Sequence, residues 1–140
     1  MKAWLMLALG ATLFIPGPVQ AATPLLGVGM AKYDDNFQTL LRNGVQQQAS
    51  VMNVDIFMEN GQDSVDLQMR QFRNLVNSKV DAIIVAMVDG KSAAQMMQLA
   101  SQAKIPLVFV NRRPDSATLA PGVAAVTSDD VEAGKLQMQY

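Results

Sequence analysis

The sequence predicts an α/β fold: a Rossmann-like parallel sheet with flanking helices. Three observations lead to this prediction. Short apolar runs recur from residue 25 onward, and each is followed by an amphipathic stretch of about a dozen residues. The run at residues 82–88 contains no polar side chain, as expected for a strand covered on both faces. Strands that alternate with helices in this way are joined by right-handed crossovers and therefore pair in parallel.

The first predicted strand covers residues 25–30, and the segment after it is predicted to be a helix. The apolar side chains of this helix recur at helical spacing, so that one face would carry Phe37, Leu40, Leu41, Val45 and Ala49. A second strand is predicted at residues 54–58, and the turn-forming residues 59–63 end it.

The next predicted helix begins after Ser64, whose hydroxyl can accept a hydrogen bond from an amide of the first helical turn. Its apolar stripe consists of Val65, Met69, Phe72 and Val76. The third strand, at residues 82–88, ends at Asp89 and Gly90, and a third helix is predicted at residues 92–103.

Two further strands and one further helix complete the predicted order. A fourth strand is predicted at residues 105–110, with Pro106 near its start, where a missing N–H donor is tolerated. A short fifth strand follows at residues 123–126, and a helix begins at residue 130. We therefore expect one α/β unit over residues 22–140.

The first 21 residues have the organisation of a secretory signal peptide. Lys2 supplies a positive start, and residues 3–15 form an almost unbroken apolar run that two prolines end. Val19 and Ala21 place compact side chains at positions −3 and −1 of a cleavage site. A short buried helix is the alternative, and a membrane anchor is disfavoured because the run is short for a span. We expect cleavage after residue 21 and an exported, soluble protein.

Composition argues against several classes of function. The chain has no cysteine and no histidine, which removes disulfides, thiolate metal sites and the commonest general base of enzymes. Lys and Arg number 11 against 12 Asp and Glu, without a basic run, so no nucleic-acid partner is indicated. Gly27 and Gly29 lack the third glycine of a dinucleotide fingerprint, and no serine has a nucleophile-elbow context. We therefore expect no enzyme, no cofactor and no metal site.

The predicted strand ends carry polar and aromatic side chains. Ligands of open parallel sheets bind beyond the carboxyl ends of the strands. The groups at these ends are residues 32–37, residues 59–63, Asp89, Asn111, Arg112 and Arg113. Carboxylates, amides and guanidinium groups bond neighbouring hydroxyls, while Tyr33 and Phe37 offer flat apolar faces. A sugar or polyol presents this combination of hydroxyl groups and C–H surface.

Structural roles remain open for the same side chains. Residues 34–36 could serve only to start a helix, although capping and ligand binding can coexist. Phe37 fits the apolar stripe of its helix and could belong to the core. Asp89 could form a plain turn, and one of the arginines at 112 and 113 could pair with Asp115 in a solvated loop.

Five segments occur in an order and spacing that are similar to those of a known family. The segments are residues 33–44, which begin with Tyr-Asp-Asp-Asn-Phe, and residues 80–85, 88–89, 105–112 and 131–137. They resemble the periplasmic sugar-binding proteins of ABC transporters, in the class of the galactose/glucose- and ribose-binding proteins. Within this class they are most similar to the inositol- and rhizopine-binding branch.

The resemblance implies roles for individual residues. The residues it places against the ligand are Asp35, Phe37, Asp89, Asn111 and Arg112. Asp35 is expected to bind ligand hydroxyls and Phe37 to stack on the ring, while Asp34 and Asn36 mainly start the helix. Relatives often have Asn three residues before the aspartate of the third strand, where this chain has Ala86. A methyl group cannot replace a hydroxyl contact, so ligand identity or affinity is in question at this position.

The resemblance also implies a function and a setting. Residues 22–140 would be the N-terminal lobe of a two-lobed protein, either truncated or a fragment, that exposes half of a binding cleft. The function would be the substrate-binding component of an ABC-type importer for an inositol-like polyol or monosaccharide in the periplasm. A permease is the expected partner, with a chemoreceptor as a further candidate. The alternative is the sugar-effector domain of a transcriptional regulator, which would carry a helix-turn-helix where this chain has the predicted signal peptide.

Overall fold

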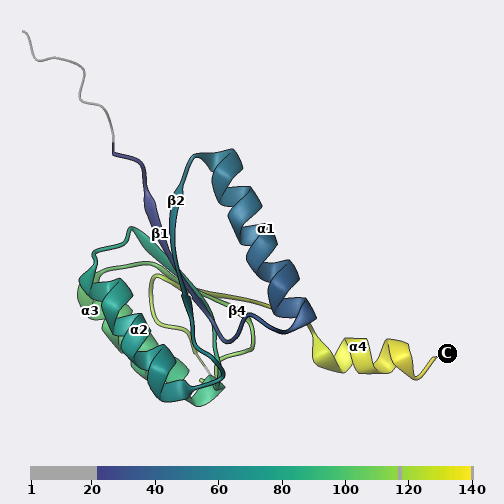
Figure 1. Ribbon diagram of the computed structural model, residues 1–140. Coiled ribbons are helices and arrows are strands. Elements are labelled where there is room, and N and C mark those ends of the chain that lie inside the picture. Colours follow the sequence, from purple (N-terminus) through teal and green to yellow (C-terminus); the bar gives the residue numbers. More distant parts are fainter. Residues whose placement is uncertain (1–21, 117, 140) are drawn as a thin grey trace, which may run out of the picture.

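The computed structural model describes residues 22–116 and 118–139. They form a five-stranded sheet with flanking helices (Figure 1). The strands are β1 (Leu25–Met30), β2 (Asp55–Asn60), β3 (Ala82–Ala86), β4 (Leu107–Asn111) and β5 (Val123–Thr127). Neighbouring strands pair in parallel, in the order β2-β1-β3-β4-β5. The predicted α/β fold is confirmed.

The helices are arranged on both faces of the sheet. They are α1 (Asn36–Met52), α2 (Val65–Asn77), the short 3-10 turn η1 (Gly90–Ser92), α3 (Ala93–Ala103) and α4 (Asp130–Gln137). Figure 1 shows α2 and α3 side by side on one face, α1 on the other face, and α4 extending away from the sheet. The two faces of the sheet are therefore covered unequally.

The larger part of the core lies between the sheet and the α2–α3 layer. Its fully buried side chains include Phe72 and Leu75 of α2, Met96 of α3, and Ile83 and Phe109 of the strands. Burying one such side chain stabilises the fold by about 1.5–3 kcal/mol. This layer therefore holds the strands, and with them the ends of the strands, in place.

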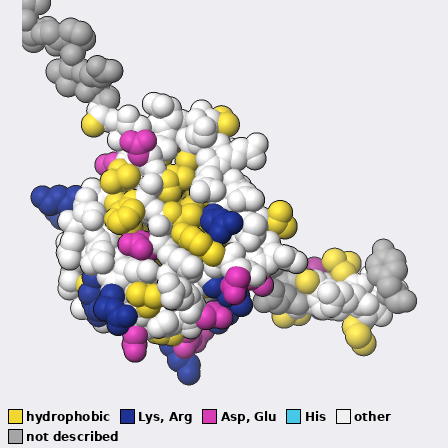
Figure 2. Space-filling view, in the orientation of Figure 1, with side chains coloured by type: hydrophobic (Ala, Val, Ile, Leu, Met, Phe, Trp, Pro, Cys, Tyr) yellow, Lys and Arg dark blue, Asp and Glu magenta, His cyan; other side chains and the backbone are white. Residues whose placement is uncertain are grey.

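The face under α1 has a smaller core. The buried residues Val28, Met30 and Ala86 form its centre. Leu40 lies on the predicted apolar stripe of α1, yet it is 71% exposed. A groove of about 720 Å³ with a largely apolar lining runs between α1 and the sheet, with Leu26 among the residues that line it. Figure 2 shows hydrophobic side chains gathered on the surface over the strands between α1 and α2.

Local signals account for most of the element bounds. The Ser64 hydroxyl accepts a hydrogen bond from the backbone N of Leu67 at 3.3 Å, so the predicted cap of α2 is confirmed. Asn53 and Lys104 end α1 and α3 in the left-handed conformation that closes many helices. The strand bounds differ from the prediction in four strands. β2 continues to Asn60, through part of the predicted turn, and β3 ends at Ala86 instead of residue 88. β4 begins at Leu107 instead of residue 105, and β4 and β5 each end one residue later than predicted.

The predicted signal peptide, residues 1–21, lies outside the described residues. Across residues 22–116 and 118–139, no helix has both the length and the apolar character needed to cross a membrane.

Candidate functional site

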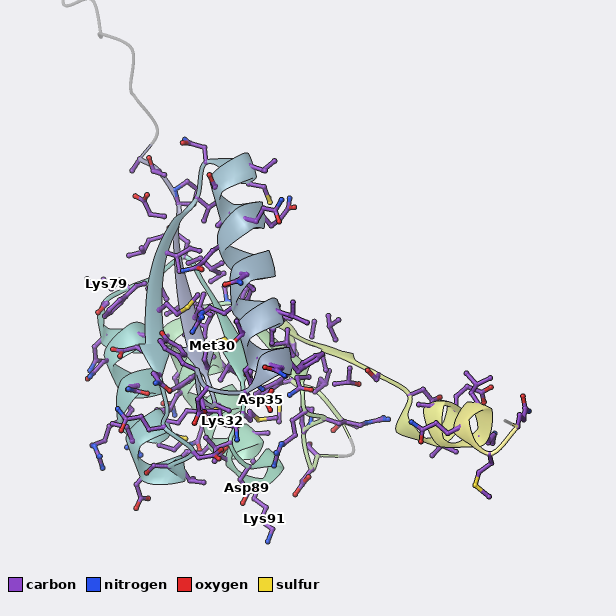
Figure 3. All side chains as sticks on the ribbon, turned by 45° about the vertical axis from the view of Figure 1, so that its right-hand side comes forward. Met30, Lys32, Asp35, Lys79, Asp89 and Lys91 are labelled. Atoms are coloured by element: carbon purple, nitrogen blue, oxygen red, sulfur yellow. The ribbon has the colours of Figure 1, made fainter. Side chains whose placement is uncertain are left out.

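The strand order creates a switch point between β1 and β3. The chain leaves β1 through α1 to reach β2 on one side, and then returns past β1 to place β3 on its other side. The segments that follow β1 and β3 therefore separate at the carboxyl edge of the sheet, where open α/β sheets bind ligands. Figure 3 shows Asp35 and Asp89, one from each segment, in the same lower part of the molecule, away from Lys79.

Asp35 is the N-cap of α1. Its Oδ1 accepts a hydrogen bond from the backbone N of Gln38 at 3.0 Å, and its own backbone is extended, as is usual for a cap. The prediction gave the start of the helix mainly to Asp34 and Asn36. Asn36 is the first residue of α1, but the capping side chain is that of Asp35, and Asp34 makes no capping bond to the described residues. The second carboxylate oxygen of Asp35, Oδ2, accepts no hydrogen bond from the described residues and remains available as an acceptor.

Phe37 lies in the first turn of α1 with 53% of its surface exposed. The hypothesis that it belongs to the core does not hold within the described part of the chain. The exposed ring offers an apolar plane at the same end of α1 as the carboxylate of Asp35.

Asp89 caps the turn that follows β3. Its Oδ1 accepts a hydrogen bond from the backbone N of Lys91 at 3.0 Å, and its carbonyl oxygen accepts one from the Ser92 hydroxyl at 2.6 Å. The turn role that the sequence left open is thus present. As in Asp35, the second carboxylate oxygen has no hydrogen-bond partner among the described residues.

Asn111 and Arg112 follow each other at the end of β4. Asn111 has a φ of 68°, in the left-handed region that Asn adopts more readily than most residues. The backbone N of Arg112 donates to the carbonyl oxygen of Val110 at 2.8 Å, so the chain turns sharply after the strand. Both side chains are exposed. Neither Arg112 nor Arg113 forms an ion pair with Asp115 or with another described carboxylate.

The segments after β3 and β4 touch at Gly90. The backbone N of Asp115 donates to the carbonyl oxygen of Gly90 at 3.3 Å. A Cβ atom on Gly90 would lie 2.5 Å from Oδ1 of Asp115 and 3.0 Å from the carbonyl oxygen of Arg113. A larger residue at this position would require Asp115 and the backbone at Arg113 to move, and the close approach brings Asp89 and Arg112 to one part of the edge.

Tyr33 is not a free aromatic surface. Its ring packs against the small core under α1, and Cζ of Arg42 lies 4.7 Å from the ring centroid. Burial raises the pKa of Tyr33, and the opposing effect of Arg42 is smaller. Of the two aromatic residues that the sequence offered here, Phe37 is the one whose ring is available to a ligand.

Ala86 lies at the end of β3 and is 1% exposed. It packs with Val28 and Met30 in the small core under α1. The position at which the resemblance led us to expect Asn is therefore an apolar, buried one in this chain.

Gln68, which is not among the residues predicted from the sequence, has a side chain that is 2% exposed. Its Nε2 donates to the carbonyl oxygen of Ala86, and its Oε1 accepts from the backbone N of Val88, both at 2.9 Å. Helical spacing was the available signal. Gln68 lies three residues after Val65 and four before Phe72, so it shares the predicted apolar stripe of α2.

Charged contacts at this edge are weak. Nζ of Lys32 lies 3.4 Å from Oδ2 of Asp63, which joins the segments after β1 and β2, but both side chains are largely exposed. In the part of the chain that the structure describes, no three acidic side chains gather as a metal site would require. The edge therefore offers hydrogen-bonding groups and one aromatic ring.

Comparisons with known proteins match almost the whole described chain. A family model described as the periplasmic binding protein domain matches residues 26–140. A Rhizobium meliloti protein named for rhizopine binding is 43% identical over 114 residues, which cover 80% of this chain and 37% of that protein. A periplasmic D-galactose/methyl-galactoside binding protein of Haemophilus influenzae is 31% identical over 120 residues (84% and 36%). A xylitol-binding protein of Mycolicibacterium smegmatis is 32% identical over 132 residues (94% and 37%).

A solved structure shares the fold of the chain. The ABC transporter solute-binding protein of Bacillus halodurans, with bound myo-inositol, superposes with a TM-score of 0.72 at 25% identity. The superposition covers 86% of this chain and 44% of that one.

The chain spans a little over a third of the length of the curated relatives described above. The family match covers residues 26–140, which include all five segments on which the resemblance rests, and the relatives share more than 30% identity with the chain. The resemblance is confirmed, and the chain belongs to the family described as the periplasmic binding protein domain.

Proposed function

We propose that the chain is the N-terminal lobe of the substrate-binding component of an ABC-type importer and contacts an inositol-like polyol or a monosaccharide. The observation that carries the proposal is the pair of carboxylates, Asp35 and Asp89, from the two sides of the switch point, each with one oxygen that accepts no hydrogen bond from the described residues. The exposed ring of Phe37 follows Asp35 by two residues. The rhizopine, galactoside and xylitol binding named for the relatives supports this ligand class.

Each candidate side chain has a role suited to a polyhydroxylated ring. The free oxygens of Asp35 and Asp89 would accept hydrogen bonds from hydroxyl groups, and bonds to a charged acceptor are the stronger ones. The Phe37 ring would cover an apolar C–H face. Asn111 and Arg112 would donate to the remaining oxygens. These are binding roles, as expected of a family of binding proteins, and we propose no enzymatic activity.

The lobe would supply only part of the ligand contacts. Two-lobed binding proteins close around the ligand by hinge motion. The relatives are nearly three times as long as the matched span, and the remaining contacts would come from that additional length. A site that stays open to water binds weakly, because the ligand is incompletely desolvated and fewer hydrogen bonds form.

The proposed setting is the periplasm, with a membrane permease as partner and a chemoreceptor as a second candidate. Residues 1–21 would be removed during export, so the mature protein would begin at Ala22. Mass spectrometry of the exported protein checks this boundary. A periplasmic form that still begins at Met1 would contradict the cleavage.

A chimera tests the ligand proposal. Residues 22–140 replace the matching stretch of the Rhizobium meliloti relative, circular dichroism establishes folding, and calorimetry measures binding of myo-inositol, galactose and ribose. We expect at least one of them to bind, and Phe37→Ala to weaken that binding by about 1–3 kcal/mol, the scale of a lost ring contact. Asp34→Ala, with an exposed side chain that caps nothing, is the control. A folded chimera that binds none of the three would overturn the proposal.

A further inference from the structure

We propose that Gln68 is a positioning residue of the ligand site: its buried amide fixes the segment from Ala86 to Asp89, and thereby the direction of the Asp89 carboxylate. The ligand contact of Asp89 rests on the proposed function. The positioning itself rests on contacts within this chain.

The Gln68 amide extends the hydrogen-bond pattern of β3 beyond the end of the strand. The last residue of β3, Ala86, pairs with Val110 of β4. On the chain that continues from there, Gln68 donates to the carbonyl oxygen of Ala86 and accepts from the N–H of Val88. A residue in a parallel ladder bonds the same two groups, one on each side of the residue it faces. The side-chain amide therefore takes the place of a strand partner for Met87.

The two hydrogen bonds of Gln68 are important because the chain at Ala86 and Met87 is buried. Gln68 is almost fully buried, and so is Met87, which packs into the α2–α3 core. A buried carbonyl or N–H without a partner is strongly disfavoured, so the segment keeps the conformation in which Gln68 reaches both groups. Asp89 follows directly, and its bonds to Lys91 and Ser92 fix the turn beyond it. The Asp89 carboxylate is thus held from both sides.

Gln68 also lies where the segments after three strands meet. The backbone N of Gly61, after β2, donates to the carbonyl oxygen of Met30 at the end of β1, at 2.8 Å. A Cβ atom on Gly61 would lie 2.9 Å from that oxygen and 3.3 Å from Cβ of Gln68. Gln68 also bonds the segment after β3. A substitution of Gln68 should therefore alter the backbone at the carboxyl edge of the sheet, where the candidate residues lie.

Gln71 provides a matched control on the same helix. Its Nε2 donates to the carbonyl oxygen of Asn60 at 2.9 Å, so it also bonds a strand end through a side-chain amide. That strand is β2, and Gln71 makes no hydrogen bond to the segment from Ala86 to Asp89. A substitution of Gln71 therefore removes one side-chain bond to a strand end and leaves this segment untouched. The Oε1 of Gln71 is buried without a partner among the described residues, so no second bond is lost.

Amide hydrogen exchange, measured by NMR on the chain itself, tests the positioning. In Gln68→Met, which keeps the length of the side chain and removes both bonds, the Val88 amide should exchange about tenfold faster relative to Ile84 in the middle of β3, the effect of one lost hydrogen bond. Gln71→Met should leave this ratio unchanged. If Gln68→Met does not fold, Gln68→Asn, too short to reach both groups, should show the same selective effect. A Val88 amide as protected as in the parent would overturn the proposal.

Ligand affinity in the chimera tests whether Gln68 acts through Asp89. Gln68→Met should weaken binding about tenfold, and Gln68→Met combined with Asp89→Ala should bind no more weakly than Asp89→Ala alone. Losses that add in full would mean that Gln68 acts elsewhere, and would overturn its positioning role. A folded chimera that binds none of the sugars would overturn the proposed function, and the Val88 exchange ratio would still decide whether Gln68 fixes the segment.

Discussion

Two aspartates at the carboxyl edge each use one carboxylate oxygen for a capping hydrogen bond and leave the other without a partner among the described residues. One oxygen of Asp35 caps α1, and one oxygen of Asp89 caps the turn after β3. A capping bond orients the side chain before any ligand arrives, so less conformational entropy is lost on binding. Helix start and ligand binding, which the sequence left as alternatives, are therefore compatible at these two positions. Their contact with a ligand stays a prediction.

Substitutions of Asp35 separate its helix-capping role from its proposed role in ligand binding. Asp35→Ala should lower the free energy of unfolding by about 1 kcal/mol, the usual effect of a lost cap, whereas Asp35→Asn keeps a good cap and should stay near the parent. Both variants should weaken ligand binding in the chimera, because both lose the charged acceptor. Urea unfolding and calorimetry give the two values. Equal losses of stability in Asp34→Ala and Asp35→Ala would contradict the assignment of the cap.

The raised pKa of Tyr33 predicts that the free energy of unfolding depends on pH in the alkaline range. Burial raises its pKa above the ordinary value of 10.0, so the folded chain holds the phenolic proton more tightly than the unfolded chain. The stability that the protonated phenol contributes is fully present below pH 10.0, the pKa in the unfolded chain. It is lost as the pH rises from there through the raised pKa of the folded chain. Between about pH 9 and pH 11, Tyr33→Phe should therefore lose less stability than the parent. Urea unfolding across this range checks it, and parallel curves would count against the burial of the phenol.

At the scale of elements, α1 and α2 begin alike but are anchored differently. Each starts with a side-chain cap, yet α2 buries Phe72 and Leu75 while α1 leaves Leu40 and other apolar side chains exposed. Each helix also carries one buried glutamine Oε1 without a hydrogen-bond partner among the described residues, on Gln38 of α1 and Gln71 of α2, so the two helices differ in their buried apolar side chains. The helix that carries Phe37 is therefore held less firmly than the helix that carries Gln68.

Two glycines should respond in opposite ways to alanine. Gly44 lies within α1, where an added Cβ meets no atom within 4 Å, so Gly44→Ala should raise the free energy of unfolding by about 0.5–1 kcal/mol. A Cβ on Gly61 would lie 2.9 Å from the carbonyl oxygen of Met30, so Gly61→Ala should lower it by about 1–3 kcal/mol. Urea unfolding of both variants tests the pair. A stabilised Gly61→Ala would be inconsistent with the close contact of the segments after β1 and β2.

At the scale of the whole molecule, the sheet is covered on one face by two helices and on the other mainly by α1 (Figure 1). Parallel sheets are normally covered on both faces. Large apolar side chains remain exposed on α1, on the edge strand β5 and on α4 with its C-cap: Leu40, Val51, Met52, Val126, Val131 and Met138. Exposed apolar surface of this extent favours association between molecules.

The chain should therefore associate as its concentration rises. Sedimentation velocity over a range of concentrations measures this. Leu40→Lys and Met52→Lys, on α1, should each reduce the association, while Val65→Lys, at the start of α2, should change it less. A monodisperse monomer with a sharp, cooperative melt would show that the lobe is self-sufficient.

The order of the elements, their parallel pairing, the family and the strand ends at which candidate residues lie could all be predicted from the sequence alone. These properties follow from the spacing of apolar side chains and from short motifs, which are local along the chain. Ser64 as a helix cap and the apolar run of β3 are examples, since the residues that define them are neighbours in sequence.

Only the folded chain shows which of these side chains are hydrogen-bonded or buried and which are exposed. Asp35 is the cap rather than Asp34 or Asn36, Tyr33 is covered by Arg42, and Leu40 is exposed although it fits the apolar stripe. The bonds of Gln68 to the chain after β3 join residues eighteen and twenty positions apart. Burial and hydrogen bonding of this kind depend on which elements pack together in space, and that packing is not encoded in the period of any single element.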